Sequence, residues 1–283
     1  MKLCICNEIF QDWPWNDQFR VAADLGFDAI EIAPFTIAQS VRQITAETRR
    51  LLRHLATQTG LEIAGIHWLL AHTEGYHLTH PDPEVRRRTI EYMQDLVRFA
   101  TDIGARVAVV GSPQQRAVAP GVSYTQAWAW FKEAMVACAE LPGATDFTIC
   151  VEPLCPETGN NFILHAAEAR RMIQEINRPN VRVILDTYSS THGEADFPAE
   201  IRATGALLRH FHCNDYNGRA PGWGETDFVP IMRALLDIGY EGYCSIEVFD
   251  SEPEPREHAA RGLASLRQAL AAAERLSPGP GQR

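Results

Sequence analysis

The sequence predicts a single (β/α)8 barrel, an α/β fold in which eight parallel strands alternate with eight helices. Short β-branched apolar runs alternate with amphipathic stretches along most of the chain, which is the pattern of strands joined through helices. Glycine stands just past the end of several amphipathic stretches, where the left-handed backbone of a helix end favours it. The length of 283 residues also suits one barrel, because such barrels commonly use about 250 residues.

The expected strands are apolar and rich in β-branched residues. Gly26, Gly60, Gly104 and Gly239 each come shortly before one of them and mark the turn from a helix into a strand. The strands are expected at residues 3–7, 29–35, 62–68, 107–113, 147–154, 181–189, 208–215 and 243–248.

The expected helices follow the strands in order. The third begins at Pro81-Asp82-Pro83-Glu84, because proline and acidic residues favour a helix N-terminus, and Asn160 or Asn161 is expected to cap the fifth. Helical periodicity covers residues 17–25, 43–59, 82–103, 124–140, 165–177, 196–208, 226–238 and 254–276. Strands joined through helices run parallel, and closure into a barrel is favoured over an open, doubly wound sheet. We expect residues 1–276 to form one domain and residues 277–283 to be a disordered tail.

The composition excludes several classes of protein. The net charge of −10 argues against general binding to nucleic-acid backbones, which requires a basic surface. No apolar run approaches the roughly 20 residues that span a bilayer, so no membrane association is expected, and the N-terminus is more typical of a first strand than of a signal peptide. The seven cysteines lack paired spacing, which favours a reducing compartment, and we expect a cytoplasmic protein.

One ionisable residue lies near the end of each of the last four expected strands. The four are Glu152, Asp186, His212 and Glu247. Active sites of such barrels lie at the carboxyl ends of the strands, and an ionisable side chain in an apolar strand is costly to bury without a partner. Three carboxylates and one imidazole suit Mn²⁺, Mg²⁺ or Co²⁺ better than a structural zinc ion, which prefers thiolates. The sequence therefore predicts one divalent ion per chain at the barrel mouth.

Several segments carry a resemblance to a known family. They are Val151–Leu154, Leu185–Tyr188, His210–Asp215, Pro221–Gly224 and Ser245–Glu247. In these segments the chain resembles the xylose isomerase-like TIM barrels of the sugar isomerase and epimerase superfamily, and within it the ketose 3-epimerases related to D-tagatose 3-epimerase. The resemblance implies that the four residues above hold the ion, Mn²⁺ foremost, and that the two glutamates also move protons. It further implies a homodimer or homotetramer.

The chain departs from this family at positions that contact substrate. Ketose 3-epimerases usually have a histidine where this chain has Ser189, a glutamate one residue after the position of Glu157, and an arginine where Gly218 precedes Arg219. Glu157, Ser189 and Arg219 are therefore expected to contact a substrate that the resemblance does not identify.

Aromatic residues follow two of the expected strands. His67 and Trp68 end the third strand, and Trp15 comes after the first. An aromatic surface suits the apolar face of a sugar, since such rings pack against apolar groups. Of these residues, we expect His67 and Trp15 to contact the substrate.

Few charged groups are left for other roles near the mouth. Arg116 and Arg219 are the cations that could pair with an anionic substrate, so both a free sugar and a sugar phosphate stay open. Glu31, inside the second strand, is expected either to orient a polar network in the barrel interior or to form a buried ion pair.

The expected activity is the isomerisation or epimerisation of a sugar or sugar phosphate. Glu152 and Glu247 would serve as acid and base for proton abstraction next to a carbonyl, and a metal would stabilise the resulting enediolate. A metal-dependent dehydratase of a cyclic keto-polyol such as inosose or dehydroshikimate is the alternative, because it begins with the same step. A repair endonuclease would need further histidines and a basic groove, and neither the distribution of histidines nor the net charge supports one. A barrel that has lost catalysis and only binds ligand is a further alternative, and the complete set of four predicted metal-binding residues argues against it.

Overall fold

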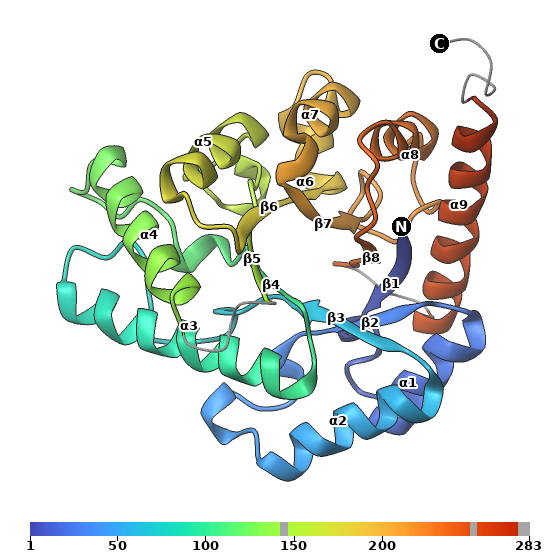
Figure 1. Ribbon diagram of the computed structural model, residues 1–283, viewed down its shortest axis with the longest axis horizontal. Coiled ribbons are helices and arrows are strands. Elements are labelled where there is room, and N and C mark those ends of the chain that lie inside the picture. Colours follow the sequence, from blue (N-terminus) through green and yellow to red (C-terminus); the bar gives the residue numbers. More distant parts are fainter. Residues whose placement is uncertain (142–146, 250–253, 277–283) are drawn as a thin grey trace.

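The protein is a closed barrel of eight parallel strands that follow one another in chain order (Figure 1). The computed structural model describes residues 1–141, 147–249 and 254–276. The strands are β1 (Lys2–Cys6), β2 (Ala29–Ile32), β3 (Glu62–Ile66), β4 (Val107–Val110), β5 (Thr148–Val151), β6 (Val181–Asp186), β7 (Leu208–Cys213) and β8 (Tyr243–Ile246). β8 pairs with β1 and closes the barrel. The predicted fold class is thus confirmed.

Helices form an outer ring around the strands (Figure 1). They are α1 (Trp15–Leu25), α2 (Ala46–Thr59), α3 (Pro83–Ile103), α4 (Tyr124–Ala139), α5 (Ala166–Ile176), α6 (Thr187–Gly193), α7 (Phe197–Thr204), α8 (Phe228–Asp237) and α9 (Pro255–Arg275). α3 begins as expected, because the Asp82 side chain accepts a hydrogen bond from the backbone N–H of Glu84 and Pro83 takes the first helical position. Gly26, Gly60 and Gly104 end α1, α2 and α3 in the left-handed conformation.

Two helix starts differ from the expectation. The sixth strand ends at Asp186 and does not continue to residue 189, because the Asp186 carboxylate accepts hydrogen bonds from the backbone N–H groups of Tyr188 and Ser189 and so begins α6. α5 begins after His165, where Glu168 completes a capping box. Asn160 caps no helix: its amide donates to the carbonyls of Leu154 and Phe162 and holds the preceding loop.

Side chains pack the interior of the barrel and the space between strands and helices. Two small clusters fill part of the interior, one of Cys4, Ala29, Ala64 and Tyr243, the other of Val107, Val109, Cys150 and Ile184. All seven cysteines are buried and free. Within the three described ranges, no helix is both long and apolar enough to cross a bilayer. The expected tail at 277–283 lies outside the described residues.

Candidate metal and substrate site

The four predicted metal-binding residues lie at the carboxyl ends of four consecutive strands. Glu152 and Glu247 directly follow β5 and β8, Asp186 is the last residue of β6, and His212 is the penultimate residue of β7. Asp186 and His212 are paired in register. All four side chains are nearly inaccessible to solvent, so their charges depend on one another and on any ligand that they hold.

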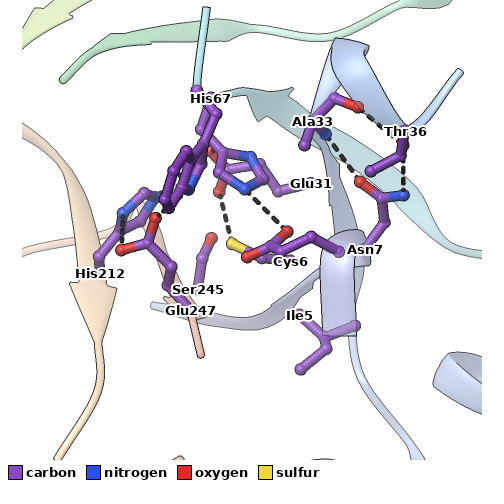
Figure 2. Close-up of polar contacts among 12 residues, drawn as sticks. Ile5, Cys6, Asn7, Glu31, Ala33, Thr36, His67, His212, Ser245 and Glu247 are labelled. Atoms are coloured by element: carbon purple, nitrogen blue, oxygen red, sulfur yellow. Dashed lines mark hydrogen bonds and ion pairs between the residues drawn. The ribbon is translucent and has the colours of Figure 1, made fainter. Parts of the chain in front are cut away.

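One ring nitrogen of His212 has no hydrogen-bond partner, although it is buried. This atom, Nδ1, lies 3.3 Å from Glu247 Oε2 and 3.8 Å from Glu152 Oε1, and Figure 2 shows the ring facing the Glu247 carboxylate. One ligand atom from each of the three residues lies within 4.8 Å of the others. A buried imidazole nitrogen between two carboxylates fits a divalent cation, which would bind its lone pair and balance the negative charge.

Asp186 faces the same space but stands apart from this close group of three. Its two oxygens accept hydrogen bonds from the backbone N–H groups of Tyr188, at 3.3 Å, and Ser189, at 2.8 Å. Since each carboxylate oxygen has two lone pairs, these bonds orient the carboxylate and leave acceptor capacity for a cation.

Neighbouring residues fix the positions of the two glutamates. Gly111 lies against the Glu152 carboxylate, and a side chain at this position would collide with it. The indole N–H of Trp68 donates to Glu247 Oε1 over 2.7 Å. A substitution at Gly111 would thus displace the Glu152 carboxylate, and one at Trp68 would remove a hydrogen bond from Glu247.

A buried polar network lies beneath this group, inside the barrel (Figure 2). Glu31 on β2 accepts from His210 Nε2 over 2.8 Å and lies 3.4 Å from His212 Nε2 and 3.6 Å from His67 Nδ1. The other ring nitrogen of His67 lies 2.8 Å from Glu8 Oε2. Of the two expectations for Glu31, the structure shows features of both: the residue is in a polar network, and the network is a buried set of ionisable partners.

A cavity of about 520 Å³ opens above the group at the mouth of the barrel. Glu152, Asp186 and Glu247 line it, together with the predicted substrate residues His67 and Glu157. Glu157 is exposed at the rim. This volume falls within the range of pockets that bury small ligands, about 300–1,000 Å³.

The other four residues predicted to contact substrate are not among the described residues that line this cavity. Arg116 is fully buried and donates to the carbonyl of Val110 over 3.2 Å. Ser189 is buried in α6, Trp15 is half-buried at the start of α1, and Arg219 is half-buried in the loop after β7. Their contact with a substrate stays a prediction.

The cavity also uses aromatic residues that the sequence-based prediction did not select. Trp68, Tyr188 and Phe249 line it, and Phe249 packs edge to face against both of the others, at centroid distances of 6.2 Å and 5.3 Å. Trp68 has a left-handed backbone, with φ of 53°. Side chains alternate between faces in a regular strand, so this turn of the backbone brings Trp68 to the mouth beside His67.

The carboxylates have very different affinities for protons. Burial raises the pKa of Glu152 to about 8, and the charges of Glu247 and Asp186 add to this effect, while His212 opposes it. Burial also raises the pKa of Asp186, to about 6. Burial acts in the same direction on Glu247, but the charge of His212, with help from His67 and Trp68, outweighs burial and lowers the pKa.

The imidazole of His212 favours its charged form in the ion-free chain. Burial lowers its pKa, but the charges of Glu247 and Glu31 outweigh burial and hold the pKa well above the ordinary value. A divalent cation at Nδ1 would replace this proton, since metal ions bind the neutral imidazole.

The loop between β7 and α8 is organised by a single carboxylate. Asp215 accepts hydrogen bonds from the backbone N–H groups of Tyr216, Gly222, Gly224 and Thr226, at 2.8–3.0 Å. Gly224 packs so closely on this carboxylate that a Cβ atom there would collide with it. The sequence motif that contributed to the resemblance therefore has a structural role beside the site.

A closed parallel barrel with carboxylates and an imidazole at the carboxyl ends of its strands is the arrangement of a TIM-barrel enzyme. The chain belongs to the xylose isomerase-like TIM barrel family, whose family model matches residues 19–269. The resemblance stated from the sequence is confirmed.

Individual relatives are epimerases by name. A D-psicose 3-epimerase of Ruminiclostridium cellulolyticum is 26% identical over 248 residues, which cover 84% of this chain and 80% of that protein. A fructoselysine 3-epimerase of Escherichia coli O157:H7 is 25% identical over 276 residues, covering 92% and 95%. Among solved structures, a D-psicose 3-epimerase studied in the presence of D-fructose is similar in fold, with a TM-score of 0.83 at 23% identity, covering 95% of this chain and 99% of that one. The expected enzyme class, an isomerase or epimerase, is borne out by the curated relatives, which do not favour the dehydratase alternative.

Proposed function

We propose that this protein is a divalent-metal-dependent epimerase or isomerase that moves a proton on the carbon next to the carbonyl of an unphosphorylated sugar. The observation that carries the proposal is the pair Glu152 and Glu247, whose carboxylates line the cavity and flank Nδ1 of His212, a buried atom without a hydrogen bond. Support also comes from the curated relatives, which are named D-psicose 3-epimerase and fructoselysine 3-epimerase.

The two glutamates are suited to opposite roles. Epimerisation removes a proton from one face of a carbon atom and delivers a proton to the other face, so it needs a base and an acid. In the ion-free chain the pKa of Glu152 is raised to about 8, whereas the pKa of Glu247 is lowered. Glu152 thus holds a proton more readily than Glu247, which favours Glu152 as the acid and Glu247 as the base, and the roles exchange in the reverse reaction.

The metal would be held by Glu152, His212 and Glu247, with Asp186 as the fourth residue. It would supply electrostatic stabilisation of the negative charge that develops on the substrate oxygens. Trp68, which donates to Glu247 Oε1, keeps that carboxylate in place for proton transfer.

The charge of the cavity favours a substrate without phosphate. Among the described residues that line it there is no lysine or arginine, whereas four are carboxylates: Glu152, Glu157, Asp186 and Glu247. A phosphate group would find no guanidinium or ammonium partner among these residues, and Glu157, the lining carboxylate that is not assigned to the metal, would repel it. The lining of the cavity therefore supports a free sugar over a sugar phosphate as the proposed substrate.

Exchange of carbon-bound protons with solvent deuterium tests the proposal. The Mn²⁺-loaded protein would be incubated in D₂O with D-fructose, D-psicose, D-tagatose and D-fructose 6-phosphate, and the proton next to the carbonyl followed by NMR. We expect exchange with at least one free ketose and slower exchange with the phosphate. Glu152→Gln and Glu247→Gln should each slow exchange at least 100-fold, which corresponds to about 2.7 kcal/mol.

Controls separate the proposed roles from general damage. Glu133→Gln, on the exposed face of α4, makes the same chemical change away from the cavity and should leave the rate unchanged. Ser189→Ala should alter the preference among ketoses more than it lowers the highest rate. Wild-type exchange by Glu152→Gln with Mn²⁺ bound would rule out the proposed proton transfer.

A further inference from the structure

The carboxylate of Glu31 joins β2 to two histidines of β7 inside the barrel. It is fully buried, as are His210 and His212. The closed strand order separates β2 from β7 by β1 and β8, so the Glu31 side chain reaches across the interior. His210 and His212 are two residues apart on one strand and therefore point to the same side of it.

The geometry points to Glu31 as a positioning residue that fixes the His212 ring with Nδ1 directed at the proposed cation. This inference rests on the proposed metal site. If Nδ1 binds the ion, the ring proton of His212 must lie on Nε2, and the group that faces Nε2 is Glu31 Oε1, at 3.4 Å. A carboxylate that accepts the outer N–H of a metal-bound histidine fixes both its tautomer and the orientation of its ring.

His210 holds Glu31 in turn. Its Nε2 lies 2.8 Å from the other oxygen of Glu31, Oε2, and 3.3 Å from the hydroxyl of Ser245. The Cys6 thiol also approaches Oε2, at 3.9 Å. Oε2 of Glu31 thus faces His210, whereas Oε1 faces His212 and, at 3.6 Å, Nδ1 of His67. Only a group that accepts at both of its atoms satisfies the ring N–H groups of His210 and His212 together.

Glu31 itself is poorly placed to be a ligand of the ion. Glu152 and Glu247 line the cavity, from which a cation and a substrate can enter. Glu31 and His210 have no exposed surface, and neither is among the described residues that line the cavity. Glu31, His210 and His212 could also gather around an ion, but that ion would have no contact with a substrate.

The substitution Glu31→Gln tests the inference because it keeps the shape of the side chain and changes one acceptor into a donor. Whichever way the amide lies, its NH₂ group meets the N–H of His210 or of His212. The Mn²⁺ dissociation constant, measured by electron paramagnetic resonance of free Mn²⁺ on chelator-treated protein, should rise 10- to 100-fold. The coupling of bound Mn²⁺ to the imidazole nitrogen, measured by pulsed resonance, should change as well.

Glu8→Gln is the matched control. Glu8 is also a glutamate bonded to a histidine of this network, but it contacts His67 Nε2 and not His212. Mn²⁺ affinity should stay within threefold of wild type in this variant. If Glu31→Gln does not fold, Glu31→Asp replaces it: this side chain keeps the charge but is too short to reach both rings, and it should weaken Mn²⁺ binding at least fivefold.

The outcomes separate this inference from the proposed function. A wild-type protein that binds no Mn²⁺ would overturn the metal site and the inference with it. Wild-type binding with unchanged affinity and nitrogen coupling in both Glu31 variants would overturn the inference alone. Loss of all binding in Glu31→Gln, with normal binding in Glu152→Gln and Glu247→Gln, would make Glu31 a direct ligand and also overturn it.

Discussion

Two glutamates of the same site differ in their affinity for a proton because their neighbours differ. Glu247 receives the Trp68 N–H and lies 3.3 Å from His212 Nδ1, whereas Glu152 is buried over Gly111 with weaker support from His212. In the ion-free chain the two carboxylates thus differ in pKa before any substrate binds. This difference has a consequence for stability as well as for chemistry.

The contribution of Glu152 to the stability of the ion-free protein should fall as the pH rises from about 5 to 8. Glu152 has a pKa of about 8 in the folded chain against an ordinary 4.5, so the folded state keeps a proton that the unfolded state releases in this window. Below pH 4.5 both states are protonated and there is no cost; above pH 8 the cost is complete. Glu152→Gln removes this dependence, and its melting temperature should exceed that of wild type increasingly up to pH 8.

Thermal unfolding in the presence of chelator, at pH values from 5 to 9, measures this difference. At each pH the melting temperature of wild type is subtracted from that of Glu152→Gln, which cancels most contributions of other groups. A difference that stayed constant across the range would contradict the raised pKa of Glu152.

Trp68→Phe should lower kcat/KM about 10-fold with little change in metal content. The substitution keeps an aromatic wall but removes the N–H that bonds Glu247, and a hydrogen bond to a charged group contributes about 1.5–3 kcal/mol. Trp128→Phe is the matched control, since the Trp128 indole also donates to a glutamate, Glu175, over 2.8 Å. Steady-state kinetics should show the loss for Trp68 alone; an equal loss in both variants would assign it to general destabilisation.

At the scale of the secondary-structure elements, the loop between β7 and α8 is held by a defined set of hydrogen bonds. The β7–α8 loop has no regular structure of its own between Asn214 and Asp227, yet four of its backbone N–H groups bind the one carboxylate of Asp215. Burial raises the pKa of Asp215, but the donors from Thr226, Gly224 and Tyr216 outweigh burial and lower it. The loop is therefore built on an ionised aspartate.

Asp215→Asn should destabilise the protein by about 2–4 kcal/mol, because a buried donor left without a partner costs about 1–3 kcal/mol and the amide can accept at only one atom. Asp227→Asn is the control: the exposed Asp227 accepts a single N–H, from Val229, at the start of α8, and this change should cost less than about 1 kcal/mol. Urea unfolding measures both. Equal, small effects would show that the loop does not depend on Asp215.

The elements were predictable where hydrophobic periodicity and capping signals agree. α3 begins at Asp82 and Pro83 as expected, and Gly26, Gly60 and Gly104 end their helices. α6 was not predicted, because Thr187 and Tyr188 favour a strand by composition. The Asp186 carboxylate overrides that preference by capping the first turn, and a capping contact of this kind depends on where the strand ends.

At the scale of the whole molecule, barrel closure explains which site residues the sequence could predict. Residues at the ends of β5 to β8 follow the repeat of strand and helix, so Glu152, Asp186, His212 and Glu247 could be placed at one mouth from spacing alone. Trp68 was expected beside His67 at the end of the third strand but was not chosen as a substrate contact, because its direction depends on a left-handed backbone. The pairing of Glu31 with His210 and His212 depends on how closely β2 and β7 face each other across the closed barrel. The sequences of the two strands alone do not reveal this distance.

Because all seven cysteines are buried, chemical modification of their thiols reports on local opening of the protein. Five lie in strands β1, β5, β7 and β8, Cys138 lies in α4, and Cys155 lies in the loop after β5. Burial raises the pKa of Cys155 to about 11 and of Cys138 to about 12, so a thiol reagent meets little thiolate until the surrounding structure separates. The order in which the seven sulfurs are alkylated, read by mass spectrometry, would then rank the parts of the barrel by the free energy of their local opening. Cys155, held by a loop, should react before the strand cysteines, and an ion bound at Glu152 should delay its modification.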